Sequence, residues 1–178
     1  MATVTTHECS RDARKEFSAT MENPYHFTAS GLDNVFLVDI HCFVCSDCGE
    51  VSAEIPAVRQ LLSLIARDLV QKPFALTGSE VRFLRKRLRK KQIDFARQIG
   101  LEPETLSRIE NGHLQPSEPT DKLTRLYYAL ASRDPLLLRE LQREVDAMMT
   151  QWRRVLPPKK IIATVSDNNE WKVDLVAA

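Results

Sequence analysis

The sequence predicts an α+β protein that is mainly α-helical, and two observations carry this prediction. Residues 56–133 hold apolar side chains at helical spacing, bounded by residues that favour helix ends. Short runs rich in β-branched and aromatic residues lie on either side, at residues 25–44 and 160–176. We therefore expect a small N-terminal β module, a helical middle and a closing C-terminal β-hairpin.

Composition limits the class of protein. The chain has 178 residues, a net charge of +1 and 43% hydrophobic residues, which can build a core in one or two small domains. No stretch has the layout of a signal peptide or the roughly 20 apolar residues of a membrane helix. We expect a cytoplasmic protein with reduced thiols and no membrane partner. Without a glycine-rich phosphate loop, a Ser/His/Asp arrangement or an HExxH motif, we expect no enzyme.

The N-terminal β module is predicted from two runs. Residues 25–30 (YHFTAS) and 35–44 (VFLVDIHCFV) flank a Gly/Asp/Asn turn at 31–34, which indicates a hairpin whose second strand runs into Cys45. Pro56 then suits the first turn of a connector helix that ends near residue 73. Its apolar stripe consists of Leu61, Leu62, Ile65 and Leu69.

The central segment, residues 79–133, predicts short helices joined by one very tight turn. Apolar positions expected to face inward are Val81, Leu84, Leu88, Phe95, Ala96, Ile99, Leu106 and Ile109. A helix from about Lys91 to Ile99 would end through Gly100 in the left-handed conformation, and Pro103 starts the next helix. Two short helices joined so closely must cross at a steep angle, which is helix-turn-helix geometry.

The helix from Pro103 to Ile109 exposes small polar groups and one arginine. Its outer face is expected to carry Glu104, Thr105, Ser107 and Arg108. Such a helix fits a DNA major groove, because arginine can bond guanine bidentately and threonine can touch base edges. Gln92, Asn111 and Gly112 suit flanking phosphates. The basic run at residues 82–91, which includes Arg85, Lys90 and Lys91, adds long-range attraction for DNA.

This segment resembles the Cro/repressor (XRE-type) helix-turn-helix family. The residues that carry the resemblance are Gln92, Ala96 and Gly100, followed by Thr105-Leu106-Ser107-Arg108-Ile109-Glu110-Asn111-Gly112. The resemblance implies a five-helix DNA-binding domain in which Pro103, Glu104, Thr105 and Arg108 face bases, while Gln92 and Asn111 hold phosphates. Glu104 has two open readings: an acceptor for cytosine, or a solvated acid favoured by the helix dipole.

A second resemblance covers the residues before this domain. The chain looks like the MqsA (YgiT-type) zinc-finger/helix-turn-helix proteins, many of which are antitoxins of type II toxin–antitoxin pairs. The residues that carry it are Tyr25, Phe27, Ser30–Val35, Cys45, Cys48-Gly49-Glu50, Ile55-Pro56, Leu76-Thr77-Gly78 and Phe83–Lys86. It implies a zinc-ribbon-like module at 1–55, a connector helix at 56–73 and the DNA-binding domain at 74–133. Residues 134–178 extend beyond the family core as a further helix, beginning at Asp134-Pro135, and the hairpin.

The cysteines leave the zinc site open. The family holds one structural zinc with two CxxC pairs, and here the second pair is Cys45 and Cys48, while Thr6 replaces the leading cysteine of the first. Cys9 would be the third thiolate. The fourth ligand would be His7, with His41 and Cys42 as alternatives. A knuckle without metal and a redox role are the competing interpretations.

Three functions follow from these patterns. The first is a homodimeric repressor that binds double-stranded operator DNA and, as an antitoxin, neutralises a cognate toxin. The dimer is expected because one short helix reads few base pairs and a palindrome is read twice. The second is a stand-alone XRE-type regulator without a toxin, and the third is a protein-interaction adaptor that no longer binds DNA.

Overall fold

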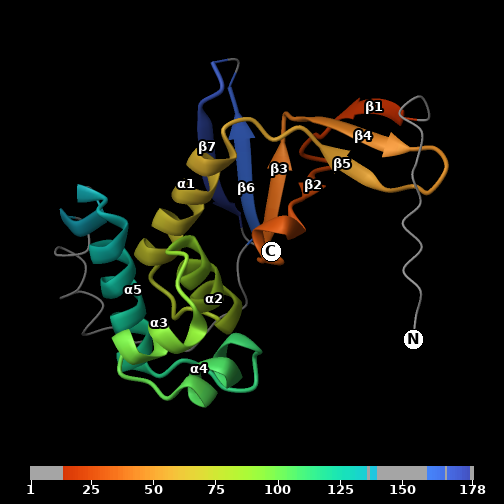
Figure 1. Ribbon diagram of the computed structural model, residues 1–178. Helices are drawn as coiled ribbons and strands as arrows, with labels where there is room; N and C mark the ends of the chain where they lie inside the picture. The colour runs from red at the N-terminus through yellow and green to blue at the C-terminus, as the bar shows by residue number, and fades with distance from the viewer. Residues whose placement is uncertain (1–13, 136, 140–159, 167, 177–178) are drawn as a thin grey trace, which may run out of the picture.

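The computed structural model describes residues 14–135, 137–139, 160–166 and 168–176, and it is a mixed α and β protein (Figure 1). Its α-helices are α1 (Val58–Gln71), α2 (Gly78–Arg87), α3 (Gln92–Gln98), α4 (Pro103–Glu110) and α5 (Glu118–Ser132). Its strands are β1 (Arg14–Ser18), β2 (Tyr25–His26), β3 (Val35–Val38), β4 (His41–Cys45), β5 (Val51–Ala53), β6 (Lys160–Val165) and β7 (Trp171–Val176). None of the described helices is long and apolar enough to cross a membrane.

The strands form two sheets, and one of them combines strands from the N-terminal and C-terminal parts of the sequence. A three-stranded antiparallel sheet has the order β1-β4-β5, and a four-stranded sheet has the order β2-β3-β6-β7. In the second sheet β3 pairs parallel with β6, with Val35 opposite Ile161. The predicted C-terminal hairpin is confirmed as β6 and β7. It shares a sheet with β2 and β3 of the predicted N-terminal module, so segments more than a hundred residues apart in the sequence lie side by side (Figure 1).

The prediction of one continuous strand at residues 35–44 is wrong. Asp39 has a left-handed backbone with φ of 56°, which ends β3 and starts β4 in the other sheet. Aspartate tolerates this conformation better than most residues. The backbone of Ala19 fixes the corner, because its N–H donates to the Ile40 carbonyl (3.0 Å) and its carbonyl accepts from the Asp39 N–H (2.9 Å). One predicted strand therefore serves two sheets.

The preceding predicted strand, residues 25–30, is also shorter than expected. Only Tyr25 and His26 pair with β3, and Thr28–Ser30 form a 3-10 turn. The turn ends at Gly31, whose φ of 81° is left-handed, in line with the predicted Gly/Asp/Asn turn.

Helix α1 connects the sheets to the remaining helices. Leu61, Ile65 and Leu69 of its predicted stripe are fully buried, and Leu62 is half-buried. The helix begins at Val58, two residues later than the predicted proline start, and the Pro56 carbonyl instead accepts a hydrogen bond from Trp171 Nε1 (2.7 Å). Helix α1 contacts β7, α2 and α5, so it lies between the four-stranded sheet and the helical half (Figure 1).

Helices α2 to α5 pack closely around the predicted apolar positions. All the side chains expected to face inward are buried, except Leu88, which is half-buried. Gly78 marks the tightest approach, because a Cβ atom at this position would lie 1.8 Å from the Ile109 carbonyl oxygen. The start of α2 therefore rests against the end of α4, and no larger residue fits without movement.

After α5, Asp134 caps the next helical turn as predicted. Its Oδ1 accepts from the Leu137 N–H (3.3 Å), and residues 137–139 are helical. The sequence predicts that this helix continues with apolar residues at Leu141, Val145, Met148 and Met149, which lie outside the described residues.

Candidate nucleic-acid interface

The turn between α3 and α4 has the predicted geometry. Gly100 has φ of 70°, and the Leu101 N–H donates to the Ala96 carbonyl (2.9 Å), which closes the end of α3. Pro103 then occupies the first turn of α4, after Glu102 as the flanking residue. Two residues thus separate a left-handed glycine from the next helix, and α3 and α4 pack directly against each other.

Helix α4 buries one face and exposes the other. Leu106 and Ile109 are buried in the helical core. Glu104 and Arg108 are exposed, and the half-buried residues beside them are Pro103, Thr105 and Ser107. The predicted base-reading residues therefore lie on a short helix whose opposite face is fixed by packing.

Just past α4, Asn111 is exposed and its Nδ2 donates to the Ser107 Oγ (3.4 Å). Gly112 follows with a left-handed φ of 76°, which turns the chain away from the helix axis. The two residues expected to meet phosphates thus lie at the end of the exposed face of α4.

A buried carboxylate joins the three helices of the interface. Arg85 of α2 donates to both oxygens of Glu110 of α4, through Nε (2.6 Å) and Nη2 (2.8 Å). Gln92 of α3 donates its Nε2 to the same carboxylate (2.9 Å). The Glu110 side chain is only 2% exposed. A bidentate pair in such a site is strong and orients its partners, so α2, α3 and α4 keep one relative position.

Because of this network, the side chains of Arg85 and Gln92, which were predicted to contact DNA, face Glu110 instead. Arg85 also donates Nη1 to the Lys90 carbonyl (2.8 Å), and its side chain is 12% exposed, so the guanidinium faces the protein interior. Gln92 is half-buried and its amide N–H group faces Glu110. Sequence reasoning missed the part played by Glu110, since only the folded chain brings it to Arg85, 25 residues away.

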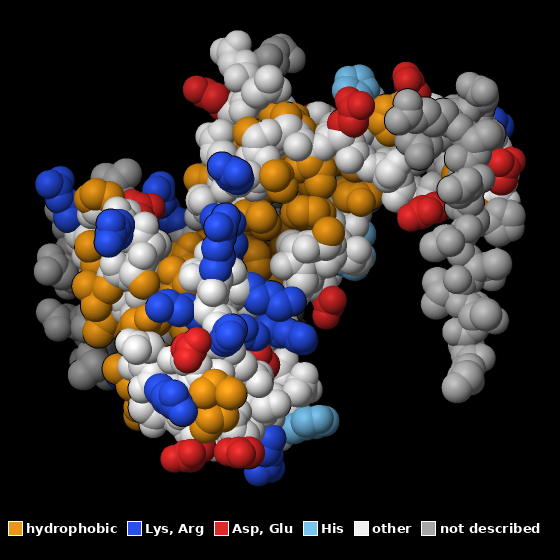
Figure 2. All heavy atoms as spheres, in the orientation of Figure 1, with side chains coloured by type: hydrophobic (Ala, Val, Ile, Leu, Met, Phe, Trp, Pro, Cys, Tyr) orange, Lys and Arg blue, Asp and Glu red, His pale blue; other side chains and the backbone are white. Residues whose placement is uncertain are grey.

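The basic run of residues 82–91 is only partly exposed. Arg82, Lys86, Arg89 and Lys91 are exposed, and Lys90 is half-buried. Arg87 turns toward α1, where its Nη2 donates to the Ser63 Oγ (3.0 Å). Figure 2 shows Lys and Arg side chains gathered over the helical half, where they can attract a polyanion.

A second buried pair holds this region to α1. Arg125 of α5 pairs with Asp121 (2.9 Å) and also donates to carbonyls at the end of α1, Leu69 (3.1 Å) and Val70 (2.8 Å). Asp121 accepts the Leu76 N–H (2.7 Å). The last carbonyls of α1 and the chain leading to α2 are therefore satisfied by one ion pair.

The Cys45/Cys48 segment forms the turn between β4 and β5. The Gly49 N–H donates to the Cys45 carbonyl (2.8 Å), and Gly49 has a left-handed φ of 72°. Cys45 is buried and Cys48 is exposed. Cys42 lies in the core, where burial raises the pKa of its thiol and keeps it neutral.

The two cysteines alone do not make a metal site. In the described part of the chain, no three metal-binding side chains lie together. The predicted ligands Cys9 and His7 fall outside the described residues. The described thiols of Cys45 and Cys48 thus amount to half of the four ligands that structural zinc needs.

Comparison with known proteins identifies the helical segment. A protein-family model described as helix-turn-helix matches residues 81–120, from α2 into α5. No curated protein and no solved structure matches the chain. The match, together with the geometry of α3 and α4, supports a DNA-binding regulator of the XRE type. It does not extend to the more specific resemblance to MqsA proteins.

Proposed function

We propose that the protein is a dimeric transcriptional repressor that reads operator DNA with α4. One observation carries the proposal: α4 exposes Arg108 and Glu104 while the Arg85–Glu110–Gln92 network fixes its position. A recognition helix must be held rigidly, because base contacts depend on an alignment of about half an ångström. Two copies of a short helix would read a palindrome with the affinity that one copy lacks.

Each exposed group has a role in this proposal. Arg108 bonds a guanine edge, while Thr105 and Ser107 touch neighbouring bases. Lys91, Lys90 and Asn111 contact phosphates on either side. Glu104 accepts from a cytosine amino group or remains solvated at the start of α4.

The decisive variant is Arg108→Ala. We expect it to weaken operator binding about tenfold to a hundredfold, the value of one good bidentate base contact, while binding to random DNA changes little. Fluorescence anisotropy with both duplexes measures this. The control, Arg82→Ala, removes an exposed arginine of α2 and should weaken both duplexes by the same small factor. If Arg108→Ala lowers the affinity for both duplexes equally, Arg108 contacts a phosphate and does not read a base.

We further propose that this repressor is the antitoxin of a type II toxin–antitoxin pair. The support is the pattern of residues 25–86 that resembles MqsA proteins, together with a β-rich half separate from α4 that is available to a protein partner (Figure 1). A basic ribonuclease-like reading frame beside the gene, and co-purification of its product with this chain, would support the antitoxin role. Their absence with intact DNA binding would favour the stand-alone regulator, and a lack of DNA binding would favour the adaptor.

We also propose a structural zinc, with Cys45 and Cys48 completed by Cys9 and His7. The support is the CxxC spacing and the left-handed Gly49 directly after it, a turn that brings both cysteines to one end of the β4–β5 hairpin. Elemental analysis of protein purified without chelator should find one zinc per chain. A folded protein without zinc would reject this part of the proposal and leave the DNA-binding part intact.

A further inference from the structure

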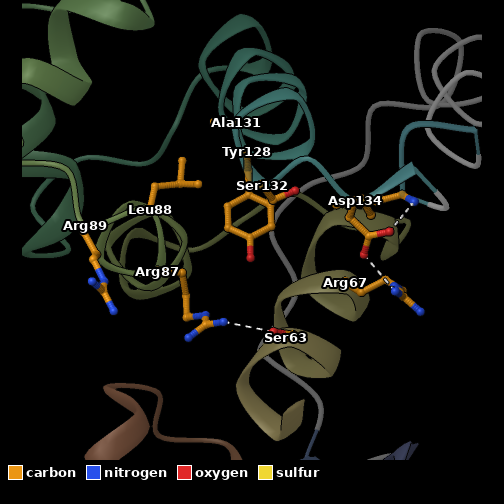
Figure 3. A pocket seen from close by; sticks show the side chains of 10 residues that line it. Ser63, Arg67, Arg87, Leu88, Arg89, Tyr128, Ala131, Ser132 and Asp134 are labelled. Carbon is orange, nitrogen blue, oxygen red and sulfur yellow. Dashed lines mark hydrogen bonds and ion pairs between the residues drawn. The ribbon is translucent and has the colours of Figure 1, made fainter. Parts of the chain in front are cut away.

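A pocket of about 350 Å³ opens between α1, α2 and α5 (Figure 3). Its polar lining comes from Ser63, Arg67, Arg87, Arg89, Tyr128, Ser132 and Asp134. No residue of α3 or α4 lines it. The pocket is thus a concave site that the proposed reading of DNA bases by α4 does not use.

The pocket carries an excess of positive charge. Arg67 is paired with Asp134, with 2.7 Å between Nη2 and Oδ2. Arg87 meets only neutral groups in its described contacts, the Ser63 Oγ (3.0 Å) and the Tyr128 hydroxyl. Arg89 is exposed at the rim, at a residue with φ of 54° just after α2. The pocket lining therefore holds three guanidinium groups and one carboxylate.

Two of these guanidinium groups have unused donors. Within the described part of the chain, the Nε atoms of Arg67 and Arg87 are buried and meet no hydrogen-bond acceptor. A buried donor without an acceptor costs about 1–3 kcal/mol. The Nη groups of Arg87 lie beside the pocket (Figure 3), where they can donate to acceptor oxygens that a ligand brings in.

Tyr128 adds a neutral donor to the same space. Its side chain is buried, and its hydroxyl points into the pocket between Arg87 and Arg67 (Figure 3). Burial raises the pKa of the Tyr128 phenol, and this effect is larger than the opposing one of the Arg87 charge. The hydroxyl therefore keeps its proton at neutral pH. It can accept from Arg87 and donate to an anion at the same time.

We propose that this pocket binds a small phosphate-type oxyanion, held by the guanidinium groups of Arg87 and Arg89 and by the Tyr128 hydroxyl. Arginine forks match the tetrahedral oxygens of phosphate in geometry and charge. The apolar wall of Leu88, Ala131 and Leu137 leaves room for a small organic group attached to the phosphate. Because α1, α2 and α5 all line the pocket, a bound anion would hold these three helices together, and α2 packs against α4.

Thermal unfolding with inorganic phosphate tests the site. At equal ionic strength, we expect phosphate to raise the midpoint of the wild type more than chloride does, since a ligand of the native state stabilises it. By calorimetry, Arg87→Gln should bind phosphate at least about tenfold more weakly, as expected for a charge-assisted bidentate contact. Arg82→Gln, on the same helix outside the pocket, should bind as the wild type does.

Two results would overturn the proposal: phosphate acting no differently from chloride, or Arg87→Gln responding as the wild type does. If Arg87→Gln fails to fold, Arg89→Gln carries the test, because Arg89 is exposed and outside the core. It must bind phosphate more weakly, and wild-type affinity in this variant would reject the site. Loss of phosphate binding with unchanged DNA binding concerns the pocket alone and leaves the proposed function untouched.

The phosphate could come from a free phosphorylated molecule or from the DNA backbone, since Arg89 adjoins Lys90 and Lys91 at the start of α3. Competition separates the two sources. The site holds a backbone phosphate if two results are found together. Phosphate must displace random DNA more than the same ionic strength of chloride does, and Arg87→Gln must lower the affinity for random DNA. If phosphate binds the DNA complex as tightly as the free protein, the site holds a free molecule. Each of these outcomes requires the phosphate site.

Discussion

The region α2–α4 and the sheet β1-β4-β5 are built on different principles. In the helical region, a capping box starts α2, and buried opposite charges fix the helices to one another, as Glu110 does with Arg85. In the sheet, hydrogen bonds between backbones hold the strands together. Its side chains are less buried, and Val51 of β5 is 43% exposed. None of the ion pairs found in the described residues lies in that sheet. The helical region is therefore the part whose elements are fixed to one another by buried charges, and a fixed position is what a helix that reads DNA bases requires.

The largest expected effect is that of Glu110→Ala. Removing this carboxylate leaves the buried guanidinium of Arg85 without a counter-charge, which costs about 3–5 kcal/mol. Urea unfolding followed by helical circular dichroism measures the loss. The control, Glu118→Ala, removes one partner of the half-exposed Glu118–Lys122 pair, where about 0.3–0.5 kcal/mol is expected. Similar losses for both variants would mean that the buried network does not fix the helices.

Gly78→Ala tests the close approach of α2 and α4. The added methyl group would lie 1.8 Å from the Ile109 carbonyl oxygen, so one helix must shift. Overpacking of this kind costs about 1–3 kcal/mol and should also move α4, which lowers operator affinity. Arg82→Ala, exposed on the same helix, is the control for stability. Unchanged stability and DNA affinity in Gly78→Ala would show that the two helices do not need this contact.

Thr77→Ala tests whether local residues set the helix boundaries. The Thr77 Oγ1 accepts from the Glu80 N–H (3.3 Å), and the Glu80 Oε2 accepts from the Thr77 N–H (2.6 Å). Loss of this capping box should cost about 1 kcal/mol. Lys91 flanks α3 without a side-chain cap, so Lys91→Ala should leave the free energy of unfolding within about 0.5 kcal/mol of the wild type. Equal effects would contradict the role of the cap.

Asp68→Asn should act in the opposite direction. Burial raises the pKa of Asp68 above its ordinary 3.8, with Glu80 adding to the rise and Lys72 opposing it. The folded state thus binds more protons than the unfolded state above that pH, so this group lowers stability as pH rises. The variant should be more stable than the wild type at neutral pH, and the difference should vanish below pH 3.8. A variant that is less stable at neutral pH would show that the charged form is favoured.

The difference between local and long-range interactions also decides which features could be predicted from the sequence. Thr77, Gly100 and Pro103 act on their own neighbours, so the helix ends and the tight turn could be predicted from the residues. The left-handed Asp39 that divides one apolar run between two sheets could not, because the neighbouring strands decide it. The pairing of β3 with β6 joins residues more than a hundred positions apart.

The candidate site follows the same rule. The exposed residues of α4 were predicted from helical periodicity, which depends only on residues a few positions away. The inward turn of Arg85 toward Glu110 depends on where α2 and α4 meet, and a basic run gives no sign of it. For the cysteines, spacing predicts a turn at Cys45 and Cys48, while Cys9 and His7, which were predicted to join them, lie outside the described residues.

The central claim is that α4 reads a DNA sequence, and one titration tests it most directly. The intact protein is titrated by anisotropy onto the DNA upstream of its own gene and onto a scrambled duplex of equal composition, across a range of salt concentrations. We expect binding to the upstream DNA to be at least about a thousandfold tighter, with both affinities falling as salt rises. Equal affinity for the two duplexes, or no salt-dependent binding to either, would contradict the claim.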